Sequence, residues 1–288
     1  MCVCPVRVMT FNVRGSFHED DGINAWSNRA PLNVETIERH APDLIGFQEL
    51  QKGNLDTYRE RLPEYGYLPG PVAGNNPPHE LNAIFFDPRR FEVLDSGGFW
   101  LSTTPERHSS SWRTRCTRSA HWANLRCLNT GLSFLHVNTH LDHASEPARV
   151  EGCRLILRKI AEIQKGREDT PPIVVTGDFN CAPGSLPHRT FTENGFVDTF
   201  LTTGNEDDED LYTFHAFKGP QYSATRSGHG SMRIDWILVK DPRQRIRTGS
   251  QFIVRDRNEE LGIYPSDHYP VLAELVLNND GFPISRSL

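Results

Sequence analysis

The sequence predicts an α/β protein of four layers, in which two packed mixed β-sheets are flanked by helices. Its 288 residues contain many short apolar strand segments and only a few segments with helical periodicity. Strands this numerous do not pair in one open sheet without curling or splitting, whereas two packed sheets with helices outside bury them all. No internal repeat or low-complexity linker divides the chain, so we expect residues 1–288 to form a single domain.

Composition and charge narrow the function classes. Hydrophobic residues make up 37% of the chain and the formal net charge is −6, with a pI near 6.1. Because each neutralised phosphate adds to affinity, this balance argues against a protein that grips long nucleic acid. No apolar run approaches a membrane span and the start lacks a signal-peptide layout, so we expect a cytoplasmic location. No obligate protein partner is evident.

Strand segments follow one another along most of the chain. Near the start, Val6, Val8 and Thr10 alternate with other residues and predict a strand that ends near Asn12. Further strands are expected at 43–47, 82–87, 91–101, 120–127, 132–139, 173–176, 234–239 and 269–277.

Three segments have the spacing of helices. Residues 28–40 read as a helix with Asn28 as a possible cap, and residues 52–62 form the next. The longest helix is expected over 145–164, because Ser145 is a natural N-cap and Pro147 falls in the first turn. The acidic run 206–210 predicts a solvated loop.

Polar side chains recur at the ends of the apolar strands. When strand ends meet at one rim of a sandwich, their side chains line one cleft. The residues placed in this way are Asn12, Glu49, His140, Asp178, Asn180, Asp235, Asp267 and His268.

Several carboxylates in one cleft repel each other and resist desolvation, and a divalent cation is the usual compensation. Carboxylate and amide oxygens are hard ligands that suit Mg²⁺, with Mn²⁺ as a possible substitute. Mg²⁺ typically takes one or two carboxylates and substrate phosphate, which matches Glu49 with Asn12 close by.

Each residue alone also has a structural explanation. Asn12 would be a strand-end turn residue, Glu49 a surface carboxylate and His140 a satisfied core histidine. Asp178 and Asn180 would form an Asx turn. The set as a whole favours the functional interpretation, because the structural one requires an independent coincidence at every position.

The ordered motifs resemble a known family. They are TFN at 10–12, QE at 48–49, NTHLDH at 138–143, GDFN at 177–180, RIDWIL at 233–238 and SDHYPV at 266–271. In this order they resemble the endonuclease/exonuclease/phosphatase superfamily, also called DNase I-like, and most of all its compact metal-dependent hydrolases. The segment 42–49 is also similar to the deadenylase branch.

The resemblance implies roles for the metal and the attacking water. Glu49 would be the main Mg²⁺ ligand, with Asn12 beside it and Asp267 adding a carboxylate near the metal. Asp178 would orient or deprotonate the water, and Asn180 would hold that water or a phosphate oxygen.

The same resemblance implies which groups face the phosphate. His268, paired with Asp235, would stabilise the charge that develops on the phosphoryl oxygens. His140 would act likewise from the other side, paired with Glu80. Arg118 is either a phosphate or substrate clamp, since guanidinium binds phosphate in bidentate fashion, or part of a solvated basic loop.

The sequence therefore predicts a Mg²⁺-dependent phosphodiesterase or phosphatase that acts on a small or short phosphorylated substrate by in-line attack of a metal-activated water. The alternative is a 3′-exonuclease of deadenylase type acting on single-stranded nucleic acid. A non-catalytic binding module would have lost metal-binding or water-handling residues, and here all these positions are filled. Substrate selectivity is expected in the loops 70–81, 103–118 and 204–230.

Overall fold

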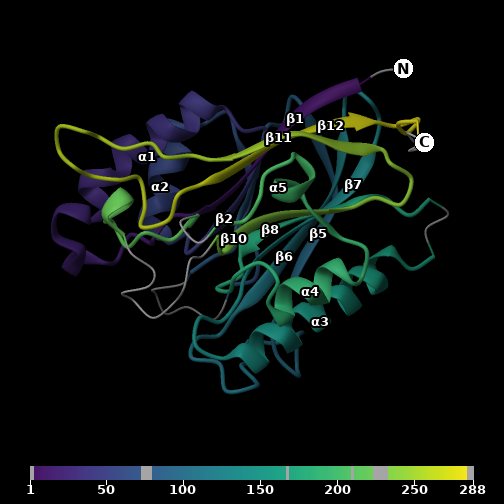
Figure 1. The fold of residues 1–288 in the computed structure, drawn as a ribbon, viewed down its shortest axis with the longest axis horizontal. Helices are drawn as coiled ribbons and strands as arrows, with labels where there is room; N and C mark the ends of the chain where they lie inside the picture. Colours follow the sequence, from purple (N-terminus) through teal and green to yellow (C-terminus); the bar gives the residue numbers. More distant parts are fainter. Residues whose placement is uncertain (1–2, 73–79, 167–168, 209–210, 223–232, 284–288) are drawn as a thin grey trace.

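A computed structural model describes residues 3–72, 80–166, 169–208, 211–222 and 233–283 (Figure 1). It contains two six-stranded sheets packed face to face, with helices on their outer faces, so the predicted four-layer fold is confirmed. The strands are β1 (Val3–Asn12), β2 (Leu44–Gln48), β3 (Gly66–Leu68), β4 (Ile84–Phe86), β5 (Phe91–Trp100), β6 (Ser119–Cys127), β7 (Ser133–His140), β8 (Ile173–Asp178), β9 (Val197–Asp198), β10 (Asp235–Lys240), β11 (Ile246–Ile253) and β12 (Val271–Asn278).

Along the chain, the helices are interspersed among the strands. They are η1 (Glu19–Asn24), α1 (Trp26–His40), α2 (Lys52–Arg61), α3 (Glu146–Gln164), α4 (Leu186–Thr192), α5 (Thr199–Thr202) and η2 (Gly219–Gln221). In the described part of the chain, no helix has both the length and the apolar character needed to cross a membrane.

The layers are held by three apolar clusters. The first sheet has the order β11-β12-β1-β2-β4-β3 and the second the order β5-β6-β7-β8-β10-β9. Between them lies a core that includes Val8, Leu44, Val174 and Ile237. Helices α1 and α2 cover the outer face of the first sheet, and α3 and α4 cover that of the second (Figure 1). The central strands of each sheet are therefore buried on both faces, which explains why β2, β8 and β10 read as nearly continuous apolar runs.

Strand direction brings the polar strand ends to one edge of the sandwich. β1 and β2 run parallel, and so do β7 and β8, so their carboxyl ends share that edge. β10 and β12 are antiparallel to their neighbours β8 and β1, so their amino ends lie there too. His140 and Asp235 are both in direct register with Asp178.

A buried polar network joins the two sheets directly behind this edge. Gln48 donates to Asn138 Oδ1 over 2.7 Å, and the Asn138 amide donates to the carbonyl of Phe47 over 2.7 Å. Thr176 donates to the same Asn138 oxygen over 3.1 Å. A Cβ on Gly46 would lie 2.2 Å from the Thr176 hydroxyl, so only glycine allows the sheets to approach this closely. The network fixes strands of opposite sheets relative to each other beneath the cleft.

Several local predictions need correction. α1 begins at Trp26 with Ala25 at its N-cap, so Asn28 lies inside the helix and is no cap. Ser145 does cap α3, because its side chain accepts the backbone N–H of Ala148. β11 is not among the predicted strands, and its pairing with β12 is interrupted by a bulge between Thr248 and Ser250. Residues 73–79, 209–210 and 223–230 of the predicted loops lie outside the described residues.

Candidate active site

The edge where the strand ends meet is hollowed into a cleft of about 1090 Å³. Its wall includes residues from both sheets and from the loops between them. Eight of the ten predicted site residues line it directly, namely Glu49, Glu80, Arg118, His140, Asp178, Asn180, Asp267 and His268. Asn12 and Asp235 lie immediately behind, bonded to Asp178 and His268 respectively.

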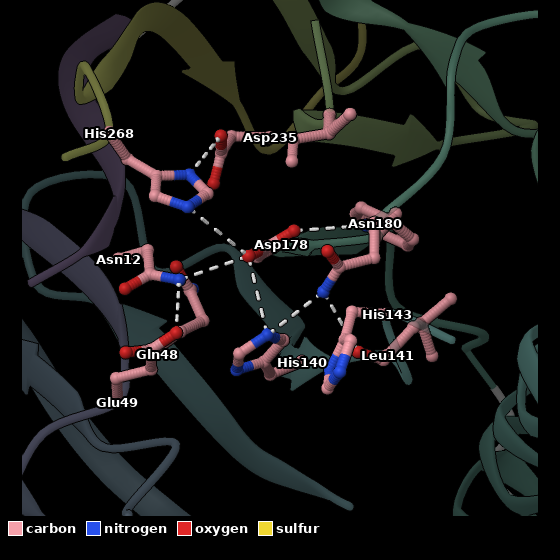
Figure 2. Close-up of polar contacts among 12 residues, drawn as sticks. Asn12, Gln48, Glu49, His140, Leu141, His143, Asp178, Asn180, Asp235 and His268 are labelled. Atoms are coloured by element: carbon pink, nitrogen blue, oxygen red, sulfur yellow. Dashed lines mark hydrogen bonds and ion pairs between the residues drawn. The ribbon is translucent and has the colours of Figure 1, made fainter. Parts of the chain in front are cut away.

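Asp178 lies at the centre of this arrangement (Figure 2). Its Oδ2 accepts a hydrogen bond from the Asn12 amide over 2.9 Å and lies 3.3 Å from His140 Nε2. Its Oδ1 accepts the backbone N–H of Asn180 over 2.9 Å. Burial and the charge of Asp235 raise the pKa of Asp178 to about 7, against the opposing charge of His268. A carboxylate with such a pKa is suited to exchange protons near neutral pH.

His268 is held as a cation by buried carboxylates. Its Nδ1 lies 2.9 Å from Asp235 Oδ2, and its Nε2 lies 3.8 Å from Asp178 Oδ2. Burial alone would lower the pKa of His268, but Asp235 and then Asp178 raise it to about 10. Because the Nδ1–H donates to Asp235, the Nε2–H is left to point toward the cleft, where it can donate to an anion.

His140 is in the opposite state, and its predicted partner Glu80 is not the one observed. Its Nδ1 lies 2.9 Å from Arg118 Nη1, and Glu80 is reached only through that arginine, 3.4 Å from it. A guanidinium can only donate, so Nδ1 of His140 must accept and Nε2 carries the proton toward Asp178. Burial and the charge of Arg118 move the pKa of His140 well below its ordinary value. The pairing with Glu80 is therefore wrong, and this histidine is neutral.

Glu49 and Asn12 are in contact, as expected from their strand ends. The Asn12 amide nitrogen donates to Glu49 Oε1 over 3.0 Å, and the Asn12 oxygen accepts the backbone N–H of Arg14 over 3.0 Å. Asn12 thus holds the two carboxylates Glu49 and Asp178 at a fixed separation. Asp267 lies nearby, 3.8 Å from the guanidinium of Arg14.

The residues around Glu49 suit a divalent cation. Burial and the charge of Glu49 raise the pKa of Glu80. Burial also raises the pKa of Asp267, and Glu49 raises it further against the opposing charge of His268. A bound cation would offset both the mutual repulsion and the loss of solvation. The donor set of the cleft therefore fits the metal that the sequence predicts.

Two of the site residues adopt left-handed backbone conformations. Glu49, with φ +57°, directly follows β2, and Asn180, with φ +50°, lies two residues after the end of β8. Residues other than glycine rarely adopt this conformation, and such strain is concentrated at functional sites. Here it turns both side chains toward the cleft. Asn180 then donates its amide to the carbonyl of Leu141 over 3.0 Å.

The basic wall of the cleft is assembled around Asp142. Its carboxylate accepts the backbone N–H groups of Arg115, Cys116, Ala144 and Ser145 at 2.7–3.2 Å. These bonds tie the loop before β6 to the start of α3. As a result Arg115, His143 and Arg149 line the same cavity as Arg118, which is buried. The interpretation of Arg118 as part of a solvated loop is therefore wrong.

Sequence reasoning missed several residues of the cleft. His18 and Arg14 come from the loop after β1, and Arg115, His143 and Arg149 from the basic wall. Arg14 lies only two residues after Asn12, so its place near the strand end could have been noticed. His18 lies in an irregular loop, where no periodicity indicates which way a side chain points.

The fold and the cleft together define a DNase I-like protein whose strand ends gather carboxylates and imidazoles as a phosphate-ester hydrolase requires. The model of the Endonuclease/Exonuclease/phosphatase family matches residues 9–268, and the chain belongs to this family. Enzymes of this family are hydrolases that act on phosphate esters and generally depend on divalent metal ions.

Similar solved structures cover almost the whole chain, and a further relative covers about three quarters of it. A Bacteroides vulgatus endonuclease/exonuclease/phosphatase is 34% identical and superposes with a TM-score of 0.82, covering 96% of this chain and 100% of that one. A Bacteroides thetaiotaomicron mannosyl-6-phosphatase is 28% identical with a TM-score of 0.82, covering 94% and 99%. An uncharacterized protein of Acanthamoeba polyphaga mimivirus is 27% identical, covering 76% of this chain and 89% of its own length.

Proposed function

We propose that this protein is a metal-dependent phosphodiesterase or phosphatase that hydrolyses a small or short phosphorylated substrate. The observation that carries the proposal is the position of Asp178 between a neutral and a cationic histidine at the bottom of a large cleft. Its pKa of about 7 lets it take a proton from water near neutral pH.

The residues of the chain divide the chemistry between them. Asp178 orients the water and accepts its proton, while Asn180 holds the water or a phosphoryl oxygen. His268 donates from Nε2 to a phosphoryl oxygen, where its positive charge offsets the negative charge that builds in the transition state. Mg²⁺ or Mn²⁺ bound at Glu49 would hold the phosphate and neutralise part of its charge.

The charge distribution in the cleft supports a substrate that carries its own anionic group. The cleft is lined by the carboxylates of Glu49, Glu80 and Asp267 and by the guanidinium groups of Arg14, Arg115, Arg118 and Arg149, which can bind an anionic group. Such a cleft accommodates a phosphorylated small molecule, and the mannosyl-6-phosphatase relative supports this class. A single-stranded nucleic acid end remains the alternative, because its terminal nucleotide offers the same phosphate to the same groups.

The test is a screen of phosphate monoesters, diesters and short oligonucleotides with Mg²⁺ or Mn²⁺. We expect hydrolysis that EDTA abolishes and that Asp178→Asn lowers by about 10²–10⁴-fold, the range for a lost general base. Asp87→Asn serves as a control, because this aspartate pairs with Arg89 outside the cleft. Turnover by Asp178→Asn at the wild-type rate would contradict its role. Hydrolysis of none of the esters with either metal would overturn the proposal.

A further inference from the structure

The loop that carries His18 is fixed firmly against the start of α2. Gln51 Oε1 accepts the backbone N–H of Ser16 over 2.6 Å and that of Phe17 over 2.8 Å. A Cβ on Gly15 would lie 2.4 Å from the same oxygen, so the close approach requires glycine. The position of His18 is thus set by backbone hydrogen bonds to a helix cap rather than by chance packing of a loop.

Two glutamates are brought to the same place by the first sheet. Glu49 directly follows β2, and Glu80 precedes the strand β4 that pairs with β2. An isolated bridge between Leu50 and Leu81, with backbone bonds of 3.2 and 2.8 Å, continues this pairing. Glu49 and Glu80 therefore lie side by side at the mouth of the cleft.

His18, Glu49 and Glu80 each offer one ligand atom, and these three atoms lie within 4.8 Å of one another. Ligand atoms about 2.1 Å from a shared ion lie up to roughly 4.2 Å apart, so small side-chain rotations would suffice to close the site. Three protein ligands with further positions left to water or substrate are typical of catalytic rather than structural metal sites.

The imidazole of His18 has an unused nitrogen. Its Nε2 is buried and has no hydrogen-bond partner among the residues that the structure describes. A buried polar atom without a partner is costly, so a ligand for that atom would stabilise the site. Imidazole nitrogen is a ligand for divalent transition-metal ions, and even Mn²⁺, which binds it least strongly among them, accepts it more readily than Mg²⁺, which prefers oxygen ligands.

The other contacts of the two glutamates leave room for a cation. Glu80 is touched by Arg118 at 3.4 Å and its side chain is still 41% exposed. Asn12 donates to one oxygen of Glu49. A carboxylate has about four lone-pair sites, so each can keep this neighbour and bind an ion as well.

We propose that His18, Glu49 and Glu80 form a mixed nitrogen and oxygen site for a divalent transition-metal ion, which gives the cleft a preference for Mn²⁺ over Mg²⁺. The inference rests on one part of the proposed function, namely that a divalent cation binds in this cleft. It differs from a site made of Asn12, Glu49 and Asp267, which would supply oxygen ligands alone.

The test measures Mn²⁺ directly. Purified full-length protein, stripped with EDTA and dialysed, is titrated with Mn²⁺ by electron paramagnetic resonance, and pulsed spectra report nitrogen bound to the ion. We expect ¹⁴N coupling in the wild type. His18→Gln should abolish that coupling and weaken Mn²⁺ binding by at least about tenfold, while Mg²⁺ affinity, measured by competition, changes far less. Glu80→Gln should weaken Mn²⁺ binding but keep the coupling.

The matched control is His143→Gln, because His143 lines the same cleft but lies outside the group of three. It should retain both the ¹⁴N coupling and the affinity, and thermal unfolding verifies that every variant is folded. Coupling that persists in His18→Gln, or Mn²⁺ bound without any nitrogen coupling, would overturn this inference and leave the proposed function standing. Absence of any Mn²⁺ or Mg²⁺ binding would overturn both.

Discussion

The cationic state of His268 is the most informative property to perturb, and Asp235→Asn does so with little change of shape. Asp235 Oδ2 lies 2.9 Å from His268 Nδ1, and both side chains are buried. The substitution removes the charge that contributes most to raising the pKa of His268, while burial continues to lower it. The amide still fills the same space between β10 and the loop before β12.

The magnitude follows from the pKa of about 10 in the intact pair. At pH 7 that value leaves roughly one His268 in 1,000 neutral. A return to the ordinary value of 6.5 corresponds to about 5 kcal/mol, at about 1.4 kcal/mol for each pKa unit. This agrees with the cost of about 3–5 kcal/mol for breaking a buried ion pair by removing one partner. We therefore expect His268 in the variant to be largely neutral above pH 7.

The sign of the effect on stability can be worked out as well. Because folding raises the pKa of His268, its contribution to stability is complete below about pH 6.5 and is lost as pH rises toward 10. The wild type should therefore lose stability over this alkaline range. The Asp235→Asn variant should be less stable than the wild type at pH 7, but its stability should change little over the same alkaline range.

The assay is an NMR titration of ¹³C-labelled histidine rings between pH 5 and pH 10.5, together with the rate of ester hydrolysis. Turnover should fall by about 10²–10³-fold, the usual cost of losing one donor to a developing oxyanion. The control is Asp256→Asn, because Asp256 forms a similar pair with His40, at 3.2 Å, away from the cleft. A His268 that still titrates near pH 10 in Asp235→Asn, or an unchanged turnover, would refute the reasoning.

Two further variants test other parts of the molecule. Arg118→Met removes the donor that fixes the tautomer of His140, so turnover should fall and ¹⁵N spectra of His140 should show a mixture of tautomers; an unchanged tautomer would exclude this role. Asp198→Asn leaves the buried Arg233 with an incomplete set of partners and should destabilise the fold by about 3–5 kcal/mol in urea unfolding. Burial opposes the charged form of Asp198, but His188 and Arg233 lower its pKa. The stability that this carboxylate contributes is therefore present above about pH 4 and is lost in acid. The stability of Asp198→Asn should depend less on acid pH than that of the wild type, and an equal dependence would contradict this role of Asp198.

Strand ends could be predicted because their geometry is simple. Apolar runs show where a buried strand stops, and parallel strands end at the same edge, so Asn12 with Glu49 and His140 with Asp178 meet. Asp235 pairs with His268 for a related reason, since a carboxylate buried in a strand requires a cation. These relations depend on secondary structure alone.

Other features depend on tertiary contacts that have no local signature. The loop residue His18 reaches Glu49 only because Gln51 holds the backbone of the preceding residues. Asp207, within the predicted solvated acidic run, instead forms an ion pair with the buried Arg233 at 2.9 Å. The partner of His140 proved to be Arg118, because Arg118 directly precedes β6 and β6 pairs with β7, which ends at His140. Sequence spacing carries no information on such contacts.

The opposite states of the two histidines follow from the groups on their Nδ1 atoms. A carboxylate at that position makes His268 a cation, and a guanidinium makes His140 a neutral donor. Asp178 lies between the two and accepts a proton more readily as His268 loses its charge, so Asp178 and His268 titrate as one unit. The rate should therefore rise with the loss of a proton near pH 7 and fall with the loss of a second near pH 10, and both steps belong to the unit rather than to single residues. The Asp235→Asn substitution must then shift both the acidic and the alkaline side of the pH–rate profile. If the base and the acid titrated independently, it would shift only one of them.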